Sequence, residues 1–120
     1  MNIISHYKNI TPYTTRDGSE IRELIHPDVQ GNQAQSLAEA IVKPGETTLL
    51  HHHIESEEIY FILQGEGNMQ LGDRQLNVKS GDSICILPGT KHCIENIGNE
   101  NLKILCCCSP AYSHTDTVII

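Results

Sequence analysis

The chain has 120 residues, of which 15 are acidic and 8 are Lys or Arg, so its formal net charge at pH 7 is -7. This length fits one domain spanning residues 1–120, and the acidic balance argues against nucleic acid and anionic membranes as partners. No apolar run is long enough to span a bilayer, and the first residues lack the basic cluster and apolar stretch of a signal peptide. We therefore expect a cytoplasmic protein.

The cysteines fit an intracellular location, because their number, five, is odd and three of them are consecutive. In an extended strand, Cys106 and Cys108 would share one face and Cys107 would take the other. We interpret these three as small buried hydrophobic residues, with a thiol that lines a pocket as the alternative. Cys85 and Cys93 lie on apolar runs and are expected in the core.

Short apolar runs alternate with turn residues along the chain, a pattern typical of many short strands. Residues 13–25 predict a hairpin with an Asp-Gly turn. Residues 36–42 have some helix propensity, but their short length and the Lys-Pro-Gly that follows favour a strand. The other strands are expected within 58–65, 68–78, 81–89 and 92–109. The spacing of the turns predicts an all-β sandwich or barrel, with residues 1–12 and 110–120 as peripheral arms.

Three consecutive histidines precede two adjacent glutamates in the middle of the chain. In a strand, His51 and His53 share one face and can converge on one cation, while His52 points to the other face. Neutral imidazole suits Zn, Cu, Fe, Ni and similar ions. The spacing alone leaves Glu57 and Glu58 open as the carboxylate partner. On its own, this pattern fits polar residues on a solvated face equally well.

Two longer motifs contain these residues, and both resemble motifs of the cupin family. The first cupin motif has Gly, His-x-His, Glu and Gly at set intervals, and residues 45–65 match it at Gly45, His51, His53, Glu58 and Gly65. The second has Gly, Pro-x-Gly, His and Asn, and residues 81–96 match it at Gly81, Gly89, His92 and Asn96. The chain departs from the second motif at Leu87, which replaces the first Pro, with Pro88 following it. The interval to Gly65 favours Glu58 over Glu57.

The resemblance implies a double-stranded β-helix, or jelly-roll barrel, that holds one divalent metal ion (Mn, Fe, Ni, Cu, Co or Zn). The ligands it implies are His51, His53, Glu58 and His92. These four ligands leave coordination positions open for water or a substrate, which is the mark of a catalytic rather than a structural metal site.

We therefore expect a metal-dependent enzyme of the isomerase, decarboxylase, lyase or dioxygenase class, acting on a small carboxylate, carbonyl or sugar-type substrate. The alternative is a non-catalytic protein that uses the metal to bind a small acid such as oxalate, or a sugar. Tyr60, on the same face as Glu58, and His114, in the C-terminal segment, are the candidate catalytic residues. We also expect a homodimer, because exposed sheet edges and terminal arms favour pairing of two copies.

Overall fold

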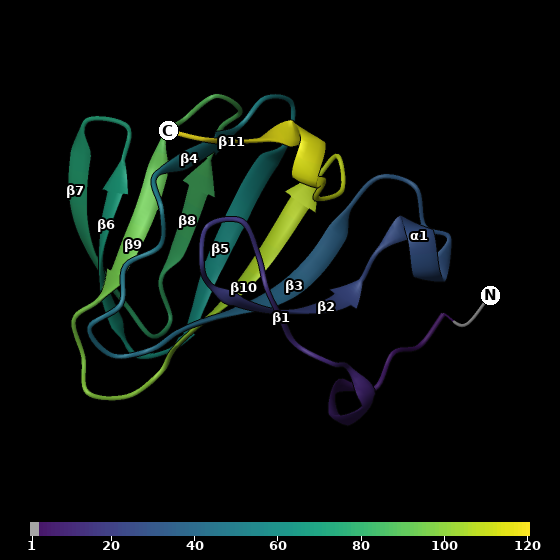
Figure 1. Ribbon diagram of the computed structural model, residues 1–120, viewed down its shortest axis with the longest axis horizontal. Helices are drawn as coiled ribbons and strands as arrows, with labels where there is room; N and C mark the ends of the chain where they lie inside the picture. Colours follow the sequence, from purple (N-terminus) through teal and green to yellow (C-terminus); the bar gives the residue numbers. More distant parts are fainter. Residues whose placement is uncertain (1–2) are drawn as a thin grey trace.

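The computed structural model describes residues 3–120 and has two antiparallel sheets that face each other (Figure 1). The larger sheet has the strand order β1-β2-β3-β10-β5-β8, and the smaller has the order β11-β4-β9-β6-β7. The strands are β1 (Tyr13–Thr14), β2 (Glu20–Ile25), β3 (Ser36–Val42), β4 (His51–His53), β5 (Glu57–Gln64), β6 (Glu66–Leu71), β7 (Arg74–Lys79), β8 (Ser83–Ile86), β9 (His92–Asn96), β10 (Leu102–Ser109) and β11 (Thr117–Ile119). Strands far apart in sequence are neighbours in both sheets, as in a jelly roll.

The predicted all-β fold is confirmed, and the expected strands form with small shifts at their ends. Residues 36–42 form β3 and not a helix, because the strand pairs with β10 along its whole length and with β2 from Leu37 to Ile41. Three short helical segments were not predicted from the sequence: η1 (Tyr7–Asn9), α1 (Pro27–Gln30) and η2 (His114–Asp116). No helix within residues 3–120 is long and apolar enough to cross a membrane.

The C-terminal segment, expected as an arm, covers the edge of the smaller sheet. Strand β11 lies beside β4 (Figure 1), and the two strands pair antiparallel with Thr117 opposite His53. Without β11, strand β4 would be the edge of this sheet. The segment therefore lies directly beside the histidine triplet.

The apolar core lies between the two sheets and follows the alternation of the strands. Strand β5 alternates exposed and buried side chains along its length, which directs Tyr60 and Ile62 inward. The largest fully buried apolar side chains are Ile62, Met69, Ile86, Ile94, Leu102 and Ile104. The expectation that Cys85 and Cys93 lie in the core is wrong. Both occupy the outward positions of their strands, so that Cys85 is exposed and Cys93 half-buried.

Main-chain hydrogen bonds between the two motifs position the strands that carry the histidines. Gly45 N–H donates to Asn96 O (3.1 Å), and Asn96 N–H donates to Glu46 O (3.0 Å). Gly89 N–H donates to His53 O (2.7 Å), which ties the Pro-Gly turn to β4. At Gly65, φ is +93° and an added Cβ would lie 3.1 Å from main-chain atoms of Asn101 and Leu102 at the start of β10, so this position requires glycine.

Candidate metal centre

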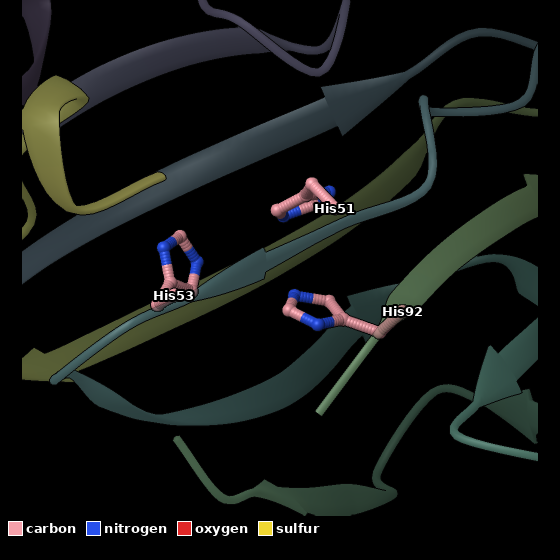
Figure 2. Close-up of side chains that lie close together, drawn as sticks. All are labelled: His51, His53 and His92. Carbon is pink, nitrogen blue, oxygen red and sulfur yellow. The ribbon is translucent and has the colours of Figure 1, made fainter. Parts of the chain in front are cut away.

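Three imidazoles converge between the two sheets. His51 and His53 are two residues apart on β4 and point inward, and His92 opens β9 directly opposite His51. One ring nitrogen from each lies within 4.8 Å of the others, and all three side chains are buried. Figure 2 shows the three rings turned toward a common space. These three histidines can therefore hold a metal ion, while His52 lies on the opposite face of β4, as alternation predicted.

A separate acceptor orients each of the three rings. His51 Nδ1–H donates to Leu49 O (2.8 Å), and His92 Nδ1–H donates to Thr90 O (2.9 Å). His53 Nδ1–H donates to the hydroxyl of Thr117 (3.1 Å). Because each Nδ1 carries the proton, each Nε2 has a free lone pair, which is the arrangement that a metal-binding histidine requires.

Glu58 approaches the same space from the larger sheet. Its Oε1 lies 3.3 Å from His53 Nε2 and 3.5 Å from His92 Nε2. Among the described residues, buried Glu58 Oε1 and buried His92 Nε2 find no hydrogen-bond partner. Unpaired buried polar atoms are costly, and a cation between them would satisfy both. Glu57, the neighbouring alternative, is exposed on the outer face of β5.

The electrostatics of the centre favour the protonation states that bind metal. Burial, together with the neighbouring His92, lowers the pKa of His51, so its neutral imidazole form predominates at neutral pH. Burial alone would raise the pKa of Glu58, but in the metal-free centre a protonated ring of His53 or His92 donates to the carboxylate and lowers its pKa, so Glu58 stays ionised. Three neutral nitrogens and one carboxylate are a donor set that fits a divalent transition metal.

The other oxygen of Glu58 is held by a thiol. Cys108 Sγ–H donates to Glu58 Oε2 at 3.3 Å, and both side chains are buried. Burial and the nearby Glu58 carboxylate raise the pKa of Cys108, so the thiol stays protonated and remains a donor. Cys108 therefore fixes the orientation of Glu58.

The two motifs and the geometry around them point to one family, and a family model agrees. The model for the cupin domain matches residues 38–108, more than half of the chain. The chain belongs to the cupin family. The jelly-roll fold predicted from the resemblance is thus that of the family, and the three histidines stand where a cupin can hold a metal ion.

Two protein relatives and one solved structure resemble this cupin over most of its length. Over its whole length it is 58% identical to an uncharacterized protein of Methanocaldococcus jannaschii, of which the match covers 97%. Over 86 residues it is 35% identical to an oxalate-binding protein of Thermotoga maritima, a match covering 72% of this chain and 71% of that protein. The crystal structure of a predicted oxalate decarboxylase from Thermotoga maritima has a TM-score of 0.78 and 30% identity, covering 89% of this chain and 98% of that chain.

A cavity opens beside the histidines of this cupin. Its volume, measured as the space open to the centre of a water molecule, is about 50 Å³. A cavity of this size can hold water or a small ligand. Its lining includes Tyr13, Thr15, Asp17, Ile21, Ala38, Ala40, His51, His53, Glu58, Tyr60, Cys106, Cys108 and Tyr112. An open hollow outside it shares Tyr13, Glu23 and Tyr112 with the cavity, so these three side chains stand between the site and solvent.

The two candidate catalytic residues occupy different places. Tyr60 is buried and lines the cavity, and burial raises its pKa, so that its phenol stays protonated. His114 lies on η2 and lines only the outer hollow. Its Nδ1 lies 3.0 Å from the hydroxyl of Tyr112, which itself lies 3.0 Å from Thr15 Oγ1. His114 therefore reaches the cavity only through Tyr112.

Three polar residues beside the centre were not predicted as part of the site, although a pocket-lining thiol was the alternative given for the cysteine triplet. Asp17 comes from the β1–β2 turn, Thr117 from β11 and Cys108 from β10. Asp17 Oδ2 lies 3.9 Å from His51 Nε2, although Asp17 was noted only as a turn residue. Alternation put Cys108 on the same face as Cys106; the structure shows that this face points inward, and the bond of Cys108 to Glu58 depends on the pairing of β10 with β5.

Proposed function

We propose that this cupin binds one divalent metal ion and uses it to act on a small molecule that chelates the metal through oxygen atoms. The proposed ligands are His51, His53, Glu58 and His92. One observation carries the proposal. Buried Glu58 Oε1 and buried His92 Nε2 lie 3.5 Å apart, and neither atom has a hydrogen-bond partner. A bound metal would supply Lewis acidity and a place for two oxygens of the substrate.

The residues around the centre support a role in small-molecule chemistry. The three Nδ1 acceptors hold the imidazoles in one orientation, and Cys108 holds Glu58. The small cavity limits the substrate to a few heavy atoms. The reaction classes that we propose are those of isomerases, decarboxylases, lyases and dioxygenases.

Elemental analysis of the purified protein tests the metal site, with two matched pairs of variants. His51→Ala and Glu58→Gln should lose most of the bound metal. The controls are His52→Ala and Glu57→Gln, which change the adjacent residues on the opposite faces of the same strands. Both controls should retain about one ion per chain. Wild-type protein purified without metal, and unable to take up Mn²⁺, Fe²⁺ or Zn²⁺, would refute the proposal. Equal metal loss in His51→Ala and His52→Ala would refute the proposed ligand set.

A second candidate function is non-catalytic binding of a small acid or a sugar at the same metal. The 35% identity to an oxalate-binding protein favours this candidate. Incubation of the metal-loaded protein with a panel of small hydroxy acids, dicarbonyls and sugars separates the two. Product detected by NMR supports an enzyme, whereas saturable binding of a compound that is recovered unchanged supports a binding protein.

We also propose that the protein works in the cytoplasm as a homodimer. None of its five cysteines forms a disulfide, which is usual in a reducing compartment. Fractionation of the native cells, with detection by an antibody, tests the location.

A further inference from the structure

The cavity beside the three histidines is acidic. Asp17 and Glu23 line it together with Glu58, and no Lys or Arg is found among the described lining residues. Arg16, next to Asp17 in sequence, donates from Nη1 to two main-chain oxygens of the C-terminal segment, at 2.8 and 2.7 Å. An anionic ligand that entered the cavity would therefore meet carboxylates and no side-chain cation other than a protonated histidine.

Asp17 presents a fixed negative charge to the centre. Its Oδ1 accepts hydrogen bonds from the N–H and the hydroxyl of Ser19, at 2.9 and 2.7 Å. Its Oδ2 lies 3.9 Å from His51 Nε2, and the Asp17 side chain is only 12% exposed. Because the turn holds one oxygen, the other is held in the cavity.

We propose that Asp17 makes this site selective for small, electrically neutral ligands that carry hydroxyl groups, and that it selects against dicarboxylates. The inference rests on the proposed function, because it requires a divalent metal at the histidines. Three neutral imidazoles and Glu58 would leave such an ion with one net positive charge, and Asp17 removes that charge. At short range inside a protein, charges are weakly screened, so a dianion would be repelled. Unpaired like charges are a common means of rejecting a wrong ligand.

The hydroxyl groups of the cavity favour the same ligand class. Tyr13, Thr15 and Tyr112 line it beside Asp17, and a hydroxyl can both donate and accept hydrogen bonds. Asp17 Oδ2 can accept a hydrogen bond from a ligand hydroxyl. A ligand carboxylate has no proton to donate to it. Short hydroxy-ketones and diols fit both the volume of about 50 Å³ and this set of partners.

A series of ligands with one shape and different charges tests the proposal. Oxalate, oxamate and oxamide have similar shapes and carry two, one and no negative charges. Each is titrated by calorimetry into metal-loaded wild type and Asp17→Asn, whose amide oxygen can still accept the bonds from Ser19. We expect Asp17→Asn to bind oxalate at least about tenfold more tightly and oxamate about threefold more tightly, but oxamide, whose N–H groups can donate to Asp17, no more tightly than wild type does. Hydroxyacetone, a neutral hydroxy-ketone, should bind wild type and lose at least about threefold in Asp17→Asn.

Asp73→Asn is the matched control, because it removes the same charge from the exposed turn between β6 and β7. It should change none of these affinities. If metal-loaded wild type and Asp17→Asn bind all probes equally, the selectivity proposal is overturned while the metal site stands. Loss of metal in Asp17→Asn, measured on the same samples, would also overturn it, because Asp17 would then be a ligand. A wild type without metal would refute the proposed function and this inference with it.

Discussion

The imidazole of His53 and the hydroxyl of Thr117 lie 3.1 Å apart and join the first cupin motif to the C-terminal strand. The Thr117 hydroxyl donates its own proton to Ser113 O (3.0 Å), so it must accept from His53 Nδ1–H. This bond leaves His53 Nε2 without a proton and directed at the centre. A residue outside both motifs therefore selects the tautomer of a proposed ligand.

Replacing Thr117 should weaken metal binding without unfolding the protein. Thr117→Val keeps the shape of the side chain but removes the acceptor, so we expect metal affinity to fall about 10-fold to 100-fold. Thr117→Ser keeps the hydroxyl and should bind metal as wild type does. Competition with a chromophoric chelator measures both. A Val variant that binds metal as tightly as the Ser variant would show that the hydroxyl does not orient His53.

The thiol of Cys108, on the larger sheet, should also support metal binding, because it orients the proposed ligand Glu58. Cys108→Ala removes the donor to Glu58 Oε2 and should lower metal affinity about tenfold, whereas Cys108→Ser restores a donor and most of the affinity. Cys106→Ala is the control, since Cys106 also lines the cavity but its thiol donates only weakly, to a main-chain oxygen at 3.9 Å. Similar losses in Cys106→Ala and Cys108→Ala would indicate a packing effect.

The shared face of His51 and His53 was predictable because a local rule decides it: they lie two residues apart on one strand. His92 was expected at the site from the resemblance of the second motif, and its place opposite His51 depends on strand pairing. Asp17 and Thr117 were not predictable in this way. They come from segments about 35 and 64 residues from the triplet, and only the order of strands in the two sheets brings them to it. The expectation for Cys85 and Cys93 failed because an apolar run alone does not tell which face of its strand is outward.

Asn96 should be important for stability and not for metal chemistry. Its buried side chain donates to Val42 O and to Glu100 O, both at 2.8 Å, and accepts from Gly98 N–H at 2.9 Å. Asn96→Ala leaves these main-chain groups without partners, so we expect the free energy of unfolding to fall by about 3 kcal/mol. Urea denaturation measures the change, and Asn99→Ala, at an exposed position in the following loop, should cost less than about 0.5 kcal/mol. Equal effects of the two variants would contradict this assignment.

The outer face of β5 should carry the contact between two copies of the chain. Ile59, Phe61 and Leu63 are 49%, 38% and 41% exposed there, and Phe61 lies opposite Leu105 of the adjacent strand. Adjacent apolar side chains on the surface of a sheet favour association, and one such face can pair with itself about a twofold axis.

Light scattering of the wild type should therefore give the mass of a dimer. Phe61→Glu should give a folded monomer, because two copies would each bury a charge at the contact. Ile97→Glu places the same charge at another exposed apolar position, 46% exposed in the loop after β9, and should remain dimeric. Circular dichroism of both variants shows whether the fold is intact. A monomeric wild type, or a Phe61→Glu variant that stays dimeric, would mean that this face does not join two copies.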